Sequence, residues 1–598
     1  MLSSTAGYVS MVAASACLLP LGSKPAGARS GSGRKHRRGR LSCKAAADGD
    51  AKRLEVDRRR VLLGLGGVAV TTNFGLSLAQ GADASQCAAV PITAEVLQCV
   101  SVPGGFRCPG LYNPSDVVDF STLPRPRGPP RVRKAAHLLD EADVKRYEET
   151  LGRMKALPDD DPRSFKRQSA IHEAYCASHY KVVPAGGGPE TVSDVHYSSI
   201  FAPWHRMYIY FFEGILGDLV GDPTFGLPYW NWDTPAGMVM PAIFDNKCSP
   251  LYNSRRNPAR VHGFIDLNLG QPKPDKAQKP KCTDDELICR MEDNLAILYR
   301  QMAVSTPKEF YGGKFCSAEL DDKGKQQHKV TGSLEAGAHT AAHIWLGDPE
   351  QANQDMGDLS TAARDPVFYS NHSNVDRMWH VWSTKLGGPL LPYQEWLDTS
   401  FVFYDADKRP VRTKVSDVLD IGKLGYTYEE HGELPWLGKR PKPATGIDRR
   451  PGKRSANKVT SSYTTVTLRN DENVYMTVAR PEKAWAGGGS GKKAPEALVV
   501  DITLDPCEYV KFDVLVNVPK GQEYKVGPRN AEFAGSFTHV PHGRSFGGGM
   551  AMIQVSYQFA LRELLEDLKS GDDGQLDITI VPVNADEVVI DDARIELL

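Results

Sequence analysis

Six of the fifteen histidines in this chain fall into two groups of three, and all but His196 lie in stretches with helical spacing. The first group consists of His172, His196 and His205, and the second of His339, His343 and His372. On a helix, His339 and His343 would share one face because they are four residues apart. The chain must therefore fold so that several helices turn histidines toward one place.

Histidine triplets of this kind predict metal sites. Neutral imidazole suits copper, zinc and iron, and copper(II) heads the affinity order of the divalent metals at nitrogen sites. Two all-histidine sites without an obligatory carboxylate or thiolate suggest a coupled copper pair that handles O2. A zinc hydrolase is the remote alternative, since Glu335 precedes His339 and cannot serve as the base of a His-Glu-x-x-His motif.

Periodicity places most of these histidines on helices. Ligand-bearing helices are expected at 167–180, 204–219, 334–345 and 366–382, and a further helix within 135–157. Together they predict a mainly α catalytic domain built on a four-helix bundle around a dicopper site. Asp376 follows His372 by four residues, so we expect its carboxylate to support the ligand shell.

The character of the chain changes after residue 430. Residues 431–456 are rich in Pro, Lys and Arg and read as a solvated linker that proteases can reach. Short alternating segments follow from 457 to 598 and predict an antiparallel β-sandwich domain. The catalytic domain would then span 85–430, and its Pro- and Gly-rich beginning, up to about 135, reads as an extended arm.

The first 84 residues have the composition of targeting signals. Residues 1–50 hold eight lysines and arginines against two acids, which is typical of an organelle transit peptide. Arg58-Arg59-Arg60 then precedes the apolar stretch 61–70, as in a twin-arginine signal. We therefore expect delivery to the chloroplast and then to the thylakoid lumen. The apolar stretch is too short to span a bilayer comfortably, so no stable membrane span is expected in the mature form.

Composition narrows the class further. The net charge of -1 on a 598-residue chain without a dominant basic patch argues against a nucleic-acid partner. A chain of this length exceeds a single core, so two or three domains are expected. The sequence does not predict an oligomeric state.

Nine cysteines remain once Cys17 and Cys43 leave with the targeting region, and an odd count keeps at least one thiol outside any intrachain disulfide. They are Cys87, Cys99, Cys108, Cys176, Cys248, Cys282, Cys289, Cys316 and Cys507.

Several motifs stand in a fixed order along the chain. Those around the histidines are Trp204-His205-Arg206-Met207-Tyr208, Glu335-x3-His339-x3-His343-Ile344-Trp345 and Asn371-His372-Ser373-Asn374-Val375-Asp376-Arg377-Met378-Trp379. Others are Glu395-Trp396-Leu397, Tyr426-x-Tyr428 and Lys511-Phe512-Asp513-Val514. In this order they resemble the tyrosinase-type plant polyphenol oxidases (catechol oxidases), from about residue 100 to the C-terminus.

The resemblance implies two copper ions per chain, with O2 as co-substrate. The first copper would be bound by His172, His196 and His205, and the second by His339, His343 and His372. Cys176 would form a thioether with His196, which accounts for one cysteine outside the disulfides.

The resemblance also implies roles around the metals. Glu335 would orient an active-site water and help to deprotonate phenols. Leu359 stands where many relatives carry a bulky gate phenylalanine above the first copper. Thr340 stands where an asparagine is linked to monophenol hydroxylation in some relatives. The C-terminal domain would cover the site and keep the enzyme latent until a protease cuts the linker.

The sequence departs from the family pattern at two places. Relatives commonly have a disulfide-forming cysteine directly after the first copper ligand, where this chain has Glu173, and the adjacent-cysteine motif that pairs with it is missing. The pairing of the N-terminal cysteines therefore stays open. Asn371 stands where many relatives have a second histidine, which leaves His372 as the ligand candidate there.

The leading expectation is a latent dicopper oxidase that converts o-diphenols to o-quinones and reduces O2 to water. A tyrosinase that also hydroxylates monophenols is the close alternative, and Thr340 favours the diphenolase. A haemocyanin-like reversible O2 carrier is the alternative from a different class. Small phenols and an activating protease are the expected partners.

Overall fold

The computed structural model describes residues 98–99, 114–126, 128–176, 180–182, 191–269, 286–304, 306–313, 315, 329–429, 432, 434–447, 465–485, 494–542 and 552–598. The expected targeting region 1–84 and Cys87, Cys108, Cys282 and Cys316 lie outside these residues. In the described part of the chain, no helix is long and apolar enough to cross a membrane.

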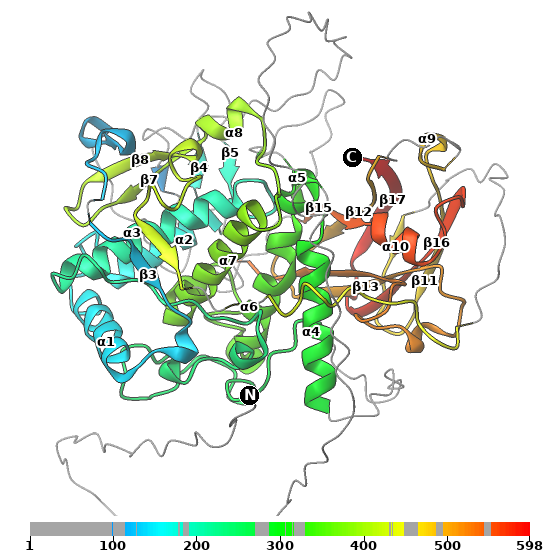
Figure 1. Ribbon diagram of the computed structural model, residues 1–598, viewed down its shortest axis with the longest axis horizontal. Coiled ribbons are helices and arrows are strands. Elements are labelled where there is room, and N and C mark those ends of the chain that lie inside the picture. Colours follow the sequence, from blue (N-terminus) through cyan, green and yellow to red (C-terminus); the bar gives the residue numbers. More distant parts are fainter. Residues whose placement is uncertain are drawn as a thin grey trace, which may run out of the picture. The chain divides into compact units, whose positions relative to one another are not determined.

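The N-terminal part is mainly helical (Figure 1). Its helices are α1 Glu141–Lys155, α2 Phe165–Cys176, α3 Phe201–Leu219, α4 Glu286–Met302, α5 Pro307–Tyr311, α6 Thr340–Leu346, α7 Pro366–Thr384 and α8 Gln394–Asp398. Helix α3 packs against α7 and α1, and α1 packs against α2.

Helix α3 is buried over most of its circumference because it is apolar on nearly every face. The ring of Phe212 on α3 stacks on Tyr369 of α7, with ring centroids 3.6 Å apart. Asp365 caps α7 by accepting a hydrogen bond from the Val367 N–H, and Pro366 occupies the first helical position. The two helices that carry His205 and His372 are thus fixed against each other by packing and by a defined helix start.

The helical part also contains small sheets made of short strands. They are β1 Gln98–Cys99, β2 Val118–Asp119, β3 Arg131–Arg133, β4 Tyr180–Val182, β5 Thr191–Ser193, β7 Ser400–Tyr404, β8 Pro410–Lys414 and β9 Tyr426–Tyr428. Strand order is β1-β4-β5 in one sheet and β2-β8-β7 in another, and β3 pairs with β9 in parallel.

The C-terminal part consists of β-sheets that enclose a main apolar core, with a smaller apolar cluster around Leu515 and Phe533. One sheet has the order β10-β17-β12-β15-β6 and the other β11-β16-β13-β14. The strands are β6 Lys329–Thr331, β10 Val466–Thr467, β11 Val474–Ala479, β12 Glu496–Leu504, β13 Val510–Val516, β14 Phe533–His539, β15 Ile553–Ala560, β16 Gln575–Asn584 and β17 Val589–Leu597, with the short helices α9 Glu482–Trp485 and α10 Arg562–Asp567. The expected β-rich domain is confirmed.

Strand β6 departs from the expected antiparallel sandwich. It belongs to the chain of the helical part, yet it pairs in parallel with β15, with Val330 opposite Ser556. The other strand pairs of these sheets are antiparallel. The helical part therefore supplies an edge strand to the C-terminal sheet.

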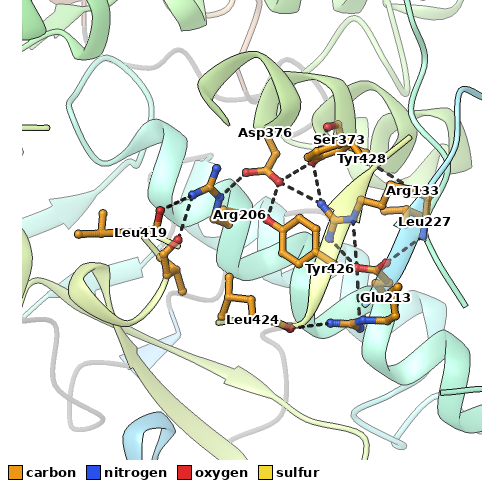
Figure 2. Close-up of polar contacts among 12 residues, drawn as sticks. Arg133, Arg206, Glu213, Leu227, Ser373, Asp376, Leu419, Leu424, Tyr426 and Tyr428 are labelled. Atoms are coloured by element: carbon orange, nitrogen blue, oxygen red, sulfur yellow. Dashed lines mark hydrogen bonds and ion pairs between the residues drawn. The ribbon is translucent and has the colours of Figure 1, made fainter. Parts of the chain in front are cut away.

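A buried charge network ties α3, α7, β3 and β9 together (Figure 2). Asp376 Oδ2 accepts hydrogen bonds from Arg133 at 3.0 Å, Tyr426 at 2.7 Å and Tyr428 at 2.5 Å. Its other oxygen accepts from Arg206 Nε. Arg133, within the expected extended arm, is fully buried and also pairs with Glu213.

Helix boundaries differ from expectation in several places. The helix expected at 167–180 ends at Cys176, and Tyr180 belongs to strand β4. The helix expected within 135–157 is a 3₁₀ turn, Ala136–Leu138, followed by α1 from Glu141. The helix expected at 334–345 begins as a π-helical turn, Glu335–His339, and continues as α6. Inside this turn Gly337 has φ −88° and ψ −122°, which ordinary helical spacing does not predict.

Part of the expected linker packs against both halves of the chain. Trp436 is buried, Lys439 pairs with Glu292 of α4 at 2.9 Å, and Arg440 pairs with Asp567 of α10 at 3.1 Å. The Ala444 N–H donates to the Glu532 carboxylate at 2.9 Å. Residues 434–447 are therefore anchored.

Candidate metal centre

The first histidine triplet converges from three segments. His172 and Cys176 lie one turn apart on α2, His196 follows β5, and His205 lies in the first turns of α3. The candidate ligand atoms of these four residues all lie within 4.8 Å of one another, and all four side chains are buried. The fold thus brings together four residues whose spacing in the sequence is only weak evidence for a metal site.

The second triplet forms a similar group. His339 ends the π-helical turn, His343 lies on α6, and His372 lies on α7. Their ligand atoms also lie within 4.8 Å of one another and are buried. His343 Nε2 and His372 Nε2 are 3.3 Å apart, a separation at which both nitrogens can reach one metal ion.

The two triplets are neighbours. The rings of His205 and His372 stack with centroids 4.2 Å apart, and those of His196 and His339 lie 6.2 Å apart. Phe201 contacts a histidine of each triplet, with ring centroids 4.6 Å from His205 and 4.7 Å from His339. Metal ions held by the two triplets would therefore be close enough to act on one small molecule.

Unpaired nitrogens mark where metal ions would bind. The Nε2 atoms of His172, His196, His205 and His339 are buried and have no hydrogen-bond partner in the described part of the chain. Burial of an unsatisfied polar atom costs free energy, so such a concentration of unpaired nitrogens indicates a ligand-binding site. The donor set of neutral imidazoles fits copper.

Burial keeps these imidazoles in the metal-binding form. It lowers the pKa of His172, His205, His339 and His372 well below the ordinary value, and neighbouring histidines lower it further. The pKa of His343 falls to about 3, again mainly through burial. Neutral rings leave a lone pair available for a metal.

In three of these histidines the other ring nitrogen, Nδ1, contacts a backbone carbonyl oxygen. His205 Nδ1 lies 2.8 Å from the Phe201 carbonyl, His339 Nδ1 3.0 Å from the Glu335 carbonyl, and His343 Nδ1 2.7 Å from the Met356 carbonyl. Each contact makes Nδ1 the protonated nitrogen and directs Nε2 toward the centre.

His196 is oriented differently, by a carboxylate. Its Nδ1 lies 3.3 Å from Asp194 Oδ1, and the same oxygen accepts its backbone N–H at 2.9 Å. Asp194 is buried and also pairs with Lys329 of β6 at 3.2 Å. Sequence reasoning missed Asp194, because an acid two residues before a histidine carries no signal until the fold shows the contact.

Glu335 lies at the start of the π-helical turn beside the second triplet. Both of its carboxylate oxygens accept the Tyr197 N–H, at 2.9 and 3.0 Å. Burial raises the pKa of Glu335 to about 7, which is where a carboxyl group can both accept and return a proton near neutrality. The Thr340 hydroxyl donates to the Glu335 carbonyl at 2.9 Å.

The π-helical turn depends on Gln301 of α4. The Gln301 Oε1 accepts the Ala338 N–H at 2.9 Å. A Cβ added to Gly337 would lie 2.2 Å from that oxygen, so a larger residue at 337 would displace the Gln301 amide from the Ala338 N–H. Gln301 thereby fixes the backbone between Glu335 and His339.

A segment of the C-terminal domain contacts residues beside the two histidine triplets. The Leu359 N–H donates to the Pro541 carbonyl at 2.9 Å, and Leu359 is buried. The Tyr197 hydroxyl lies 2.5 Å from His539 Nδ1. These contacts link both sides of the metal centre to the end of β14.

His542 is a second site residue that sequence reasoning missed. In the structure it is buried, lies with Asp194 and His196 in a third group of possible metal ligands, and has no hydrogen-bond partner for either ring nitrogen among the described residues. Its separation from the other ligands along the chain hid this contact.

The expectation for Asp376 is wrong. Its carboxylate belongs to the arginine and tyrosine network described above, and His372 Nδ1 has no partner in the part of the chain that the structure describes. Asn371, adjacent to His372, accepts a hydrogen bond from Trp232 Nε1 at 2.9 Å.

The unusual Glu173 forms an ion pair. Its carboxylate is buried on α2 and binds Arg364 at 2.8 Å. Arg364 ends the 3₁₀ turn just before α7. Cys248 and Cys289 are each disulfide-bonded.

Family models match most of the described chain. The common central domain of tyrosinase matches residues 162–385, the polyphenol oxidase middle domain 393–442, and the chloroplastic polyphenol oxidase C-terminal domain 465–597.

Similar proteins cover nearly the whole chain. A chloroplastic polyphenol oxidase of Vitis vinifera is 37% identical over 91% of this chain and 88% of its own length. The chloroplastic (+)-larreatricin hydroxylase of Larrea tridentata is 36% identical over 94% of both chains. The structure of latent apple tyrosinase is similar with a TM-score of 0.68 and 36% identity, covering 80% of this chain and 99% of that one.

Proposed function

The chain belongs to the plant polyphenol oxidases of the tyrosinase family, and from this membership we propose that it oxidises o-diphenols to o-quinones with O2 at a pair of copper ions. The observation that carries the proposal is the convergence of two buried histidine triplets whose Nε2 atoms are largely unpaired. We infer that α2, α3, α7 and the segment 335–346 form the bundle around the metals.

His172, His196 and His205 would hold the first copper, and His339, His343 and His372 the second. When bound, the copper pair supplies two one-electron redox centres that carry electrons from two diphenols to one O2, which leaves as water. The chain's contribution is to keep the imidazoles neutral, fixed by their Nδ1 contacts and shielded from bulk water.

Glu335 is the proposed proton acceptor for the phenol. Its pKa of about 7 lets it take a proton from a docking hydroxyl and release it again at neutral pH. The Tyr197 N–H fixes the carboxylate on the side of the first triplet. Leu359 would line the entrance above the first copper, and its side chain is smaller than the phenylalanine of many relatives.

The Cys176 thiol is proposed to form a thioether with His196. The two side chains belong to one compact group of buried ligands, within reach of each other. Burial raises the pKa of the Cys176 thiol, so without the bond it would be an inert neutral group. The bond would fix the His196 ring, which comes from a turn rather than a helix.

We propose that the uncut chain is latent because residues 538–542 cover the metal centre. The contacts of Pro541 with Leu359 and of His539 with Tyr197 support this. Because residues 434–447 are anchored to both halves, the activating cut is proposed at the C-terminal side of residue 447 in the 431–456 linker.

The proposed location is the thylakoid lumen of the chloroplast. The relatives from Vitis vinifera and Larrea tridentata are named chloroplastic, and residues 1–84 carry the transit and twin-arginine patterns.

Hydroxylation of monophenols is the competing activity. It is favoured by the name of the Larrea tridentata relative, a hydroxylase. Thr340 favours the diphenolase, since its hydroxyl is engaged with the Glu335 carbonyl. A reversible O2 carrier is the remaining alternative and would bind O2 without sustained consumption.

Oxygen uptake decides among these functions. Copper-loaded full-length protein is assayed with 4-methylcatechol and with tyramine, before and after limited proteolysis. Uptake with the catechol alone, raised by cleavage, is the expected result. Uptake with both substrates would make the protein a tyrosinase, and no uptake despite bound copper would overturn the oxidase proposal.

A further inference from the structure

Strand β6 is held on both sides by backbone contacts. On one side it pairs in parallel with β15 of the C-terminal sheet, with Lys329 opposite Val555 and Val330 opposite Ser556. On the other side, the Gly313 N–H of the helical part donates to the Val330 carbonyl at 2.9 Å. Carbonyl groups of successive strand residues point to opposite edges, so the carbonyl of Lys329 points toward β15. The C-terminal sheet therefore fixes the backbone of Lys329.

The side chain of Lys329 extends from this strand to the first histidine triplet. Its Nζ lies 3.2 Å from Asp194 Oδ2 and 6.0 Å from the ring centroid of Tyr197. The Asp194 side chain is 4% exposed, and among the described residues Lys329 is the one lysine or arginine that pairs with it. A buried carboxylate is costly without a cation beside it. Lys329 therefore supplies the positive charge that Asp194 requires.

The two oxygens of Asp194 have different partners. Oδ1 accepts the His196 backbone N–H at 2.9 Å and lies 3.3 Å from His196 Nδ1. Oδ2 pairs with Lys329, and His542 Nε2 of the C-terminal domain lies 3.9 Å from it. The torsion that rotates a carboxylate has only a broad intrinsic preference, so its partners set its orientation. Lys329 thus keeps Oδ1 directed at the His196 ring.

We propose that Lys329 is a positioning residue for the first copper, and that the C-terminal domain helps to retain this copper through Lys329. The sheet fixes the backbone of Lys329, Lys329 orients Asp194, and Asp194 fixes the His196 ring with Nε2 toward the metal. This inference rests on the proposed function for the identity of the metal and its ligands.

The effect should be confined to the first copper. His339 and His343 of the second triplet are oriented by the carbonyls of Glu335 and Met356, which belong to the helical part. Lys329 acts through Asp194 on His196, a ligand of the first copper alone. Removal of the C-terminal domain should therefore open the site to substrate and, at the same time, weaken the binding of one of its two metal ions.

The test is competition for copper between a chelator and the copper-loaded, uncut full-length protein. Bound copper is measured by metal analysis and by electron paramagnetic resonance, in which a coupled copper(II) pair is silent and a lone copper(II) gives a signal. Groups that orient metal ligands change metal affinity about 10–100-fold, and Lys329 acts one step further from the metal, so we expect a loss of about 3–10-fold in Lys329→Met. This variant should lose one copper per chain early and develop the signal of a lone copper.

Two further lysine variants separate positioning from general stability. Lys329→Arg keeps the cation and should restore most of the retention. Lys308→Met is the matched control, because Lys308 also belongs to the helical part and pairs with an acid of the C-terminal sheet, but that acid is Glu596 at 3.8 Å. This control should retain both copper ions like the parent.

A measurement without any substitution complements these variants. Parent protein that has been cut and separated from its C-terminal fragment should release its first copper at lower chelator concentrations than the uncut parent, and it decides the matter if Lys329→Met does not fold. Equal release by the uncut and fragment-free parent would overturn the proposal, as would equal release by Lys329→Met and Lys308→Met. A parent chain that takes up no copper would overturn the proposed function itself.

Discussion

Tyr197 and His539 share a hydrogen bond of 2.5 Å between the phenol oxygen and Nδ1, although they are 342 residues apart in sequence. His539 Nε2 lies 3.0 Å from the Pro506 carbonyl, so Nε2 carries the proton and the Tyr197 hydroxyl donates to Nδ1. Tyr197 directly follows a proposed copper ligand. The bond therefore joins the residue after His196 of the first histidine triplet to the C-terminal domain.

Removing the Tyr197 hydroxyl should weaken the docking of the C-terminal domain beside the proposed copper ligands. In Tyr197→Phe the buried His539 Nδ1 loses its partner, at a cost of about 1–3 kcal/mol. We expect the uncut variant to oxidise 4-methylcatechol several-fold faster than the uncut parent, while the proteolysed forms remain alike. The control is Tyr475→Phe, which removes an exposed hydroxyl that donates to Glu523 at 2.8 Å. Equal activity of the uncut variant and parent would contradict the prediction.

Acid should weaken the docking of the C-terminal domain. Burial lowers the pKa of His539 from 6.5 to about 4, so His539 is neutral while docked and regains its ordinary pKa when released. The released state then binds more protons between these values, and docking is lost progressively as pH falls from 6.5 toward 4 but is constant above. The groups around His539 are the Tyr197 hydroxyl, His542, Asp194, Asp505 and Lys329.

The measurement is oxygen uptake at neutral pH after brief incubation of uncut protein at a series of lower pH values. His539→Asn removes this titration and should make the profile shallower between about pH 6.5 and 4, while His542, whose pKa burial also lowers, retains part of the acid response. An unchanged profile in that variant would assign the acid response to other groups.

Asp194 should control copper retention at the first site. Asp194→Asn weakens the contact that orients His196, and changes to groups that orient metal ligands typically cost about 10–100-fold in metal affinity. After dialysis against a chelator, metal analysis should show loss of copper from the first site before the second. Asp245→Asn is the control, since its carboxylate lies 3.5 Å from His262, an exposed histidine outside both triplets. Equal retention in the two variants would count against a role for Asp194.

Thr340→Asn should shift the balance of substrates. The threonine hydroxyl is engaged with the Glu335 carbonyl, whereas an asparagine side chain offers both a donor and an acceptor further from the backbone. We expect the ratio of tyramine to 4-methylcatechol turnover to rise. A variant with no gain in this ratio would show that residue 340 does not set the specificity.

The buried network around Asp376 should matter for stability. Asp376→Asn leaves Arg133 and Arg206 without a shared carboxylate, and breaking a buried ion pair costs roughly 3–5 kcal/mol. Thermal unfolding should therefore begin at a clearly lower temperature. Asp398→Asn, which removes an exposed pair with Lys414, should leave the melting temperature unchanged. Equal melting temperatures of the two variants would contradict a large contribution of this network to stability.

Local sequence patterns predicted the ligand-bearing helices well. His339 and His343, and the pair His172 and Cys176, are four residues apart, so helical periodicity alone places each pair on one face. A β-rich C-terminal domain followed from alternating segments, as in β13.

What the sequence could not predict depends on contacts between distant segments. Asp194 and His542 meet because the C-terminal domain docks beside β5. The π-helical turn requires Gln301 of another helix to approach Gly337. Asp376 was misassigned because its arginine and tyrosine partners come from three separate elements.

Because β6 pairs with β15, the C-terminal domain cannot be separated from the helical part without losing an edge strand. A C-terminal domain made by itself would lack Lys329–Thr331 and would expose the hydrogen-bonding groups of β15 along a bare sheet edge. Such an edge invites pairing with other chains, so the isolated fragment should self-associate more readily than the intact protein. The activating cut proposed above would thus also create a fragment with an aggregation-prone sheet edge.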